Sequence, residues 1–237
     1  MKKILITNDD GIFADGLIRL VKAAIEFGEV WVVAPDTERS GRSHSINIRN
    51  SFDAWKVDFP VEGVHAYACS GYPTDCVRVG TLNIVPGGAD YCFSGINYGY
   101  NLATDLQYSA TAGGAFEGAF QGLHTIAFSE EMNEVHEPTD RYLREIMAEL
   151  IEMPLDKNRI WNVNFPGGKL ADCKGVLRDR VVSMDVFYDD RYTETKVSED
   201  RSTFMIDGRR NWKASEGTDL RAILDGYVSV GIATNIS

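Results

Sequence analysis

Short apolar segments rich in β-branched residues recur along this chain, and a helical pattern separates the first two of them. That pattern, residues 17–28, has apolar residues at helical spacing and ends at Gly28. A strand, a helix and a second strand in this order form a βαβ unit, whose strands pair in parallel. The expected strands are residues 3–7, 30–34, 64–68, 91–94, 124–129 and 160–165. We therefore predict an α/β fold: a Rossmann-like, three-layer α/β/α arrangement with a mostly parallel sheet.

Further helices are expected at residues 74–84, 109–122 and 139–152. Thr139 is the expected N-cap of the last of these. A final apolar segment at 226–234 is expected to be a strand.

Two segments depart from the alternation of strands and helices. Residues 45–60 alternate apolar and polar side chains, which predicts an extended hairpin arm outside the sheet. After about residue 180 the sequence is polar and irregular but keeps Tyr, Phe and Trp, and it lacks the composition of a flexible linker. We expect one domain over 1–237, with a core over about 1–180 and a strand-rich segment over about 181–237 that packs on another surface, such as a second subunit.

The charge balance limits the partners of this protein. Its 237 residues include 24 Lys and Arg and 35 Asp and Glu, a formal net charge of −11. An acidic chain is a poor ligand for nucleic-acid polymers, whose phosphates require a basic surface. It can still take a small phosphorylated substrate where a bound cation makes the site locally positive.

The first apolar segment is too short for a secretory signal. Asn8, Asp9 and Asp10 interrupt it, and no uncharged span is long enough to cross a bilayer. We therefore expect a cytoplasmic protein that does not bind membranes. The four cysteines have no CxxC spacing, so we expect them to be reduced packing residues.

The sequence Thr7-Asn8-Asp9-Asp10-Gly11 follows the first expected strand. Ligands of open α/β sheets bind beyond the carboxyl ends of strands. Adjacent carboxylates repel each other, so this pair suits a hard cation such as Mg²⁺ or Mn²⁺. The alternative is that one carboxylate caps the next helix and the other is solvated; the location favours the metal.

The second expected strand leads into a polar loop, residues 36–45. Its Ser40 and Ser43 hydroxyls can ligate a cation, and its arginines and His44 can hold phosphate oxygens. A plain connecting loop, with His44 in a structural role, explains the same residues equally well.

The fourth expected strand is followed by polar residues of the same kind. Asn97 offers a neutral oxygen ligand, and Ser109 and Thr111 open a helix whose free N–H groups suit an anion. For each of these two residues taken alone, a role as an ordinary helix cap is the better explanation. The chain has neither a GxGxxG nor a GxxxxGK[ST] motif, which weighs against dinucleotide binding and P-loop hydrolysis.

Taken together, TNDDG, APDxExSGxSHS, SGINxGxN, YSxT and NVNFP, in this order over most of the chain, resemble the SurE family of survival proteins, which are metal-dependent nucleotidases. The resemblance implies a SurE-like fold and hydrolysis of nucleoside 5′- and 3′-monophosphates, in some members also of short polyphosphates. It also implies a homodimer or homotetramer that exchanges C-terminal segments.

The resemblance assigns roles to particular residues. Asp9 and Asp10 would be catalytic, and one divalent cation per subunit, Mg²⁺ or Mn²⁺, would be held by Asp9, Asp10, Ser40 and Asn97. Asn101, Ser109, Ala110 and Thr111 would surround the phosphate, and Ser43 and His44 would be further substrate contacts. The chain departs from the family at Ala103 and Ala110, where glycine is usual, and at Tyr72, where threonine is usual.

Two other readings remain. A haloacid-dehalogenase-type phosphatase also carries aspartates after its first strand, but it needs DxD spacing, whereas Asp9 and Asp10 are adjacent. A non-catalytic receiver or nucleotide-binding module could hold Mg²⁺ on the acidic pair for regulation, although one small module leaves the second half of the chain unexplained.

Overall fold

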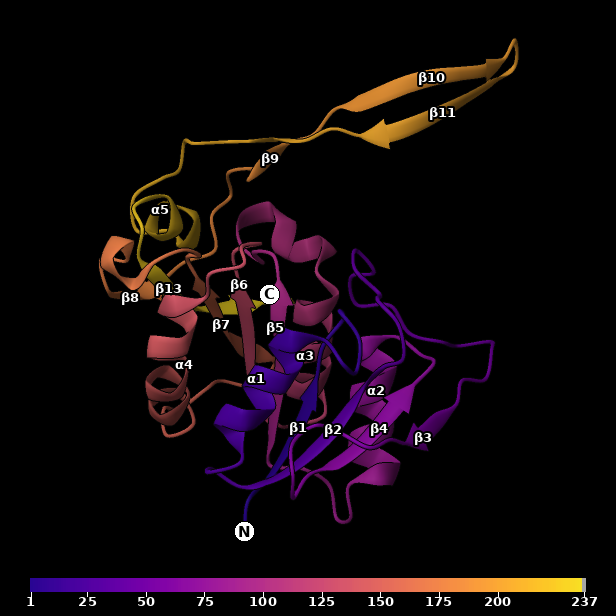
Figure 1. Cartoon of the computed structure of the whole chain (residues 1–237), viewed down its shortest axis with the longest axis vertical. Helices are drawn as coiled ribbons and strands as arrows, with labels where there is room; N and C mark the ends of the chain where they lie inside the picture. Colours follow the sequence, from indigo (N-terminus) through magenta and orange to yellow (C-terminus); the bar gives the residue numbers. More distant parts are fainter. Residues whose placement is uncertain (236–237) are drawn as a thin grey trace.

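The computed structural model describes residues 1–235. Its centre is a nine-stranded sheet in the order β3-β4-β2-β1-β5-β6-β7-β13-β8 (Figure 1). All neighbouring strands pair in parallel except β3 with β4 and β13 with β7. The strands are β1 (Lys3–Thr7), β2 (Glu29–Pro35), β3 (Ala54–Lys56), β4 (His65–Cys69), β5 (Tyr91–Tyr98), β6 (His124–Glu130), β7 (Arg159–Phe165), β8 (Val176–Arg180) and β13 (Val228–Thr234).

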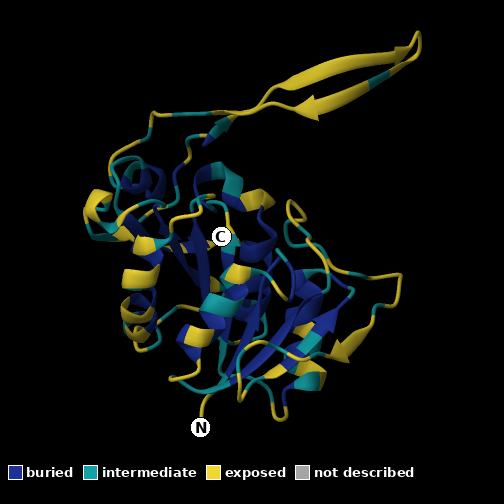
Figure 2. Cartoon of the chain, viewed as in Figure 1, coloured by how far each residue is buried: buried dark blue, intermediate teal, exposed yellow. Residues whose placement is uncertain are grey.

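Helices cover both faces of this sheet, so the predicted three-layer α/β/α fold is confirmed. Leu17, Leu20 and Val21 of α1 pack with Ile146 and Met147 of α4 in one core cluster, and the residues of α2 and α3 form clusters elsewhere on the sheet. Figure 2 shows the strands buried between these layers. The helices are α1 (Asp15–Ala24), α2 (Pro73–Val79), α3 (Ala110–Phe120), α4 (Glu137–Leu150) and α5 (Asp219–Leu224), with a π-helical turn at Gly80–Ile84 and 3₁₀ turns at Ala103–Tyr108 and Leu170–Asp172.

The prediction that residues 45–60 form a hairpin arm outside the sheet is wrong. Within this segment only Ala54–Lys56 forms a strand, and it pairs with the sheet edge at β4, where Trp55 lies opposite Ala68. The alternating side chains therefore belong to an edge strand and its approach, not to a free hairpin.

The C-terminal segment is strand-rich, as predicted. Strands β9 (Tyr188–Asp189) and β12 (Arg209–Arg210) pair with each other, and β10 (Tyr192–Ser198) and β11 (Arg201–Ile206) form a hairpin that projects from the molecule (Figure 1). The segment also returns to the sheet, because β13 lies between β7 and β8. The core therefore includes residues beyond the expected boundary at about 180.

Thr139 is not the N-cap of α4. The helix begins at Glu137 with His136 as its cap residue, and the Thr139 hydroxyl donates to Glu130 Oε2 at 2.7 Å. Pro138 sits in the first turn, where its missing N–H costs nothing. All four cysteines are free. Among residues 1–235, no helix combines the length and apolarity needed to span a membrane.

Candidate active site

A cavity of about 500 Å³ lies beyond the carboxyl ends of β1, β2 and β5. This is where a parallel sheet presents ligand-binding loops. Its lining includes most of the predicted site residues, namely Asp9, Asp10, Ser40, Asn97, Asn101 and Ser109. It also includes Glu38, Asp105, Tyr108 and Met132, to which the sequence analysis assigned no role.

The paired aspartates are held at the end of β1 by a tight turn. Gly11 has φ +109°, a conformation open to glycine, and the Asn8 side chain donates to the Gly11 carbonyl at 2.9 Å. The turn sends Asp9 inward, where it is 3% exposed, and leaves Asp10 half-buried at the cavity wall.

Each aspartate accepts a hydrogen bond that fixes its carboxylate. The Thr111 hydroxyl donates to Asp9 Oδ1, and the backbone N–H of Tyr98 donates to Asp10 Oδ2 at 3.1 Å. Burial, together with the neighbouring Asp10 charge, raises the pKa of Asp9 to about 7. Burial also raises the pKa of Asp10. Across residues 1–235 neither carboxylate forms an ion pair with a basic side chain.

The loop after β2 is fastened to α3. Ser43 has φ +51° and donates its N–H to the Tyr108 carbonyl at 3.1 Å, and its own carbonyl lies against Gly113, where a Cβ would not fit. His44 Nε2 lies 3.0 Å from Glu117 Oε2, and its ring stacks on Phe120. Ser40 therefore reaches the cavity, whereas Ser43 and His44 do not line it.

Glu117 is the anchor of that attachment. Its carboxylate is almost fully buried and also accepts from Arg78 Nη1 at 3.0 Å and from Gln121 Nε2 at 2.8 Å. Burial alone would raise the pKa of Glu117, but the hydrogen bonds from His44 and Gln121 and the Arg78 charge outweigh it and lower the pKa. A charged glutamate thus fixes the loop that carries Ser40.

The asparagines of the site have fixed amides. Asn97 donates from Nδ2 to the Gly99 carbonyl at 2.8 Å, which leaves its side-chain oxygen as the group for a ligand. The Asn101 carbonyl accepts from Asn162 Nδ2 at 2.9 Å and from Asn164 Nδ2 at 3.0 Å. This explains the NVNFP sequence, since both asparagines lie in β7 and hold the backbone of Asn101.

Ser109 is the N-cap of α3, and its hydroxyl accepts from Ala112 N at 2.9 Å. The N–H groups of Ala110 and Thr111 in the first turn are left for an anion. The side chains of both residues are fully buried and do not line the cavity. The Thr111 hydroxyl is already used to orient Asp9.

The donor set fits a hard divalent cation. Carboxylate, amide and hydroxyl oxygens are the ligands that Mg²⁺ and Mn²⁺ prefer. The two aspartates are adjacent, Asp9 buried and Asp10 half-buried, and neither has a basic partner among residues 1–235. A cation would therefore relieve both their repulsion and their desolvation. In the part of the chain described, no group of at least three His, Cys, Asp and Glu is placed to hold a metal, so a site here depends on neutral donors as well.

Comparison with known proteins agrees with this arrangement. The family model described as survival protein SurE matches residues 4–185. The chain belongs to the SurE family. Two relatives named 5′-nucleotidase SurE, from Flavobacterium psychrophilum and Mesorhizobium japonicum, are 33% identical over 231 residues and 35% identical over 243 residues. Each alignment covers 96% of this chain, with 89% and 91% of the relative.

A solved structure gives the same result for the fold. The crystal structure of the SurE protein from Aquifex aeolicus matches with a TM-score of 0.83 and 32% sequence identity, over 98% of this chain and 93% of that one. The SurE-like fold expected from the motifs is therefore confirmed over nearly the whole chain.

Of the residues that line the cavity, Asp105 was the hardest to predict from the sequence. It lies in the 3₁₀ turn before Ser109, and burial and the nearby Asp190 charge raise its pKa to about 6. In the sequence it is one aspartate among many, and only its spacing before Ser109 could have drawn attention to it.

Proposed function

We propose that this protein is a metal-dependent 5′-nucleotidase that hydrolyses nucleoside 5′-monophosphates to a nucleoside and phosphate. One observation carries the proposal: two adjacent aspartates, Asp9 buried and Asp10 beside it, share a cavity with Ser40, Asn97 and the capped N-terminus of α3. The names of the SurE relatives support the same activity.

Different residues of the cavity would bind the metal, bind the phosphate and orient the attacking water. Asp9, Asp10, Ser40 and Asn97 would hold one Mg²⁺ or Mn²⁺, which supplies positive charge to the phosphoryl group when bound. Asn101, Ser109 and the N–H groups of Ala110 and Thr111 would hold the remaining phosphate oxygens. Thr111 would also keep Asp9 in one orientation through its hydroxyl. The carboxylates of Asp9 and Asp10 are the groups available to orient the attacking water.

The groups that are held in place in this cavity suit a phosphate, and none of them selects the sugar carbon to which that phosphate is attached. We therefore extend the proposal to nucleoside 3′-monophosphates and short polyphosphates. Ser43 and His44 remain proposed substrate contacts, although neither lines the cavity. Their hydrogen bonds to Tyr108 and Glu117 support a role in holding the loop in place.

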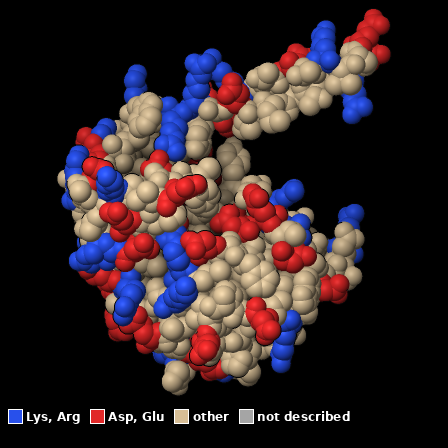
Figure 3. Space-filling view, in the orientation of Figure 1, with Lys and Arg blue, Asp and Glu red and all other residues tan. Residues whose placement is uncertain are grey.

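We further propose that this single SurE-like domain assembles as a homodimer or homotetramer by exchanging C-terminal segments. The β10–β11 hairpin is exposed along nearly its whole length, yet it carries Tyr192, Phe204 and Ile206, each more than half exposed. Figure 3 shows uncharged surface along part of this hairpin, with charged side chains gathered toward its tip. Such a surface is typical of a protein contact. Light scattering of Phe204→Asp and Ile206→Asp should give a smaller assembly than the unchanged chain.

The free, mostly buried cysteines suit a reducing compartment, so we propose a cytoplasmic location. The net charge of −11 supports small nucleotides as partners in place of nucleic-acid polymers. A membrane surface is not among the proposed partners.

Phosphate release from a panel of 5′- and 3′-nucleotides tests the proposal. The protein should release phosphate with Mg²⁺ or Mn²⁺, lose this activity in a chelator, and regain it when either metal is added back. A non-catalytic receiver or nucleotide-binding module would release none. Metal-independent release from every substrate would contradict the proposed metal site.

A further inference from the structure

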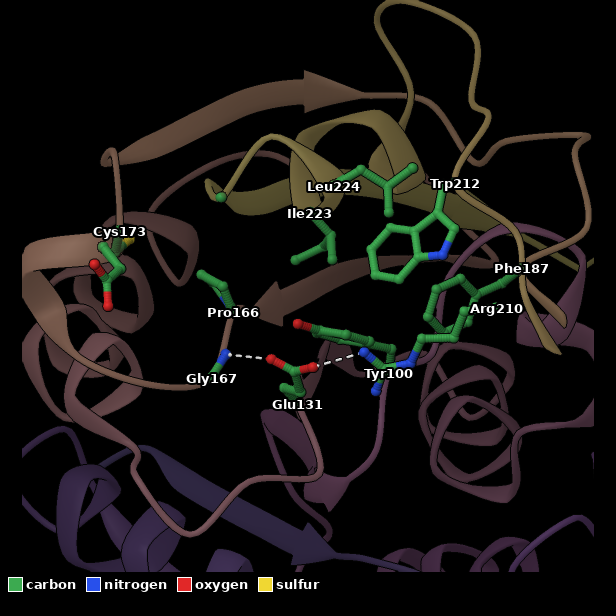
Figure 4. A pocket seen from close by; sticks show the side chains of 12 residues that line it. Tyr100, Glu131, Pro166, Gly167, Cys173, Phe187, Arg210, Trp212, Ile223 and Leu224 are labelled. Atoms are coloured by element: carbon green, nitrogen blue, oxygen red, sulfur yellow. Dashed lines mark hydrogen bonds and ion pairs between the residues drawn. The ribbon is translucent and has the colours of Figure 1, made fainter. Parts of the chain in front are cut away.

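A second cavity, of about 240 Å³, lies along the same carboxyl edge of the sheet, beyond the ends of β6 and β7. It is smaller than the about 300–1,000 Å³ of pockets that bind drug-sized ligands, so it suits one ring system. Figure 4 shows Tyr100, Phe187 and Trp212 close together on one side of it, with Glu131 and Arg210 beside them.

The two cavities are lined by neighbouring residues of the chain. Tyr100 lines the second cavity, and its neighbour Asn101 lines the cavity of Asp9. In the same way Glu131 lines the second cavity and Met132 the first. Because consecutive Cα atoms are about 3.8 Å apart, the linings of the two cavities lie close together at these positions.

Of the aromatic residues that line the second cavity, Tyr100 and Phe187 pack against each other, whereas Trp212 is exposed to solvent. The Tyr100 ring packs edge-on against Phe187 at 5.8 Å, and burial, with the Glu131 charge, raises the pKa of the Tyr100 phenol, which keeps its proton. Trp212, in contrast, is 68% exposed at the cavity. A large exposed ring beside a cavity is suited to cover a flat ligand.

Two charged side chains in the lining, Glu131 and Arg210, can form hydrogen bonds to the edge of such a ligand. Glu131 accepts from Arg210 Nη1 at 2.8 Å and from the Gly167 N–H at 3.3 Å (Figure 4). A carboxylate has more than two acceptor positions and a guanidinium has five N–H donors, so each keeps capacity for a further hydrogen bond. Side by side, they match a base edge that carries a donor next to an acceptor.

We infer that this cavity binds the nucleobase of the substrate, with Trp212 stacking on the ring and Glu131 and Arg210 facing its polar edge. The inference rests on the proposed function, because it places the phosphate of the same molecule in the cavity of Asp9. Base–aromatic stacking by one side chain contributes a factor of about 5 to 150 in affinity.

Calorimetry with the two reaction products, adenosine and inorganic phosphate, tests this on the full chain. Neither product is hydrolysed, and only adenosine has a base. Trp212→Ala should weaken adenosine binding by about 5- to 150-fold and leave phosphate binding within about twofold. Trp212→Phe should restore most of the adenosine affinity, because phenylalanine also stacks. Trp55→Ala, which removes another exposed tryptophan at the far sheet edge, should match the unchanged chain.

Equal adenosine affinity in Trp212→Ala and the unchanged chain would overturn the inference. So would equal weakening of adenosine and phosphate, or a change in assembly mass without a change in adenosine affinity, which would make Trp212 a subunit contact. If adenosine binding depends on Trp212 but no nucleotide is hydrolysed, the proposed function fails and the base site stands. If AMP is hydrolysed and Trp212→Ala binds adenosine as tightly as the unchanged chain, the proposed function stands and the proposed base site fails.

Discussion

The hydrogen bond from Thr111 to Asp9 gives the most specific prediction about the site. Replacement of Thr111 by valine keeps the side-chain volume and removes only the hydroxyl that donates to Asp9 Oδ1. Both residues are buried, Thr111 completely and Asp9 to 3% exposure, so water cannot replace the lost donor. A hydrogen bond to a charged group contributes about 1.5–3 kcal/mol, which corresponds to about 10- to 150-fold in an equilibrium or rate constant.

We expect Thr111→Val to lower kcat/KM for AMP by about that factor, because Asp9 loses its fixed orientation. The same variant should bind Mn²⁺ more weakly in calorimetry. Thr74→Val is the matched control: Thr74 is equally buried, and its hydroxyl has no hydrogen-bond partner within residues 1–235. It should leave kcat/KM near that of the unchanged chain. Equal activities of the two variants would refute the role of Thr111 in orienting Asp9.

Two further predictions concern the loop after β2 and the aspartate beside Ser109. Gly113→Ala places a Cβ against the Ser43 carbonyl and should lower kcat/KM more than tenfold by moving the loop of Ser40, whereas Gly114→Ala, whose Cβ would meet side chains at 3.2 Å and beyond, should be milder in the same assay. Asp105→Asn should raise Tm by about 2–4 °C at pH 8, an effect of about 1 kcal/mol after discounting for partial exposure. Burial raises the pKa of Asp105 to about 6, so the folded protein disfavours the charged carboxylate. The free energy of unfolding of the unchanged chain therefore falls as the pH rises from about 4 to 6, and the Tm difference between the two proteins should vanish below that range. A Tm difference that is equal at all pH values would contradict this explanation.

The core strands could be predicted from the sequence because parallel strands are buried on both faces and are therefore apolar along their whole length. Their apolar runs, such as residues 3–7 and 124–129, are continuous and end at turns, and the structure begins and ends these strands within a residue of the expected positions. The parallel order then places polar residues after β1, β2 and β5 at one edge, which is why most of the predicted site residues line one cavity.

The departures arise where a pattern does not identify its partner. An alternating segment such as 45–60 fits any antiparallel neighbour, and the structure pairs Trp55 with Ala68, which lies beyond the end of the segment. The hairpin of β10 and β11 is exposed on both faces in the single chain, so its sequence has no one-sided apolar pattern to reveal it.

The roles of individual side chains depended on packing that the sequence does not encode locally. His44 was a candidate substrate contact, but its distance to Glu117 depends on how closely the loop approaches α3 through Gly113. Ala103 has φ +53° and is buried, a conformation that glycine adopts at lower cost. Its backbone N–H donates to Asp219 Oδ2 at 3.0 Å, a contact with the C-terminal segment that helps to hold it.

Phosphate release from AMP by metal-free protein, before and after addition of Mg²⁺ or Mn²⁺, tests the central claim most directly. The unchanged chain should be inactive until a metal is added. Asp9→Asn should remain at least 100-fold less active at saturating metal, a loss of about 2.7 kcal/mol or more. Asp58→Asn, which changes an exposed aspartate away from the cavity, should respond to metal like the unchanged chain. Full activity of Asp9→Asn with either metal would contradict the assignment of the site.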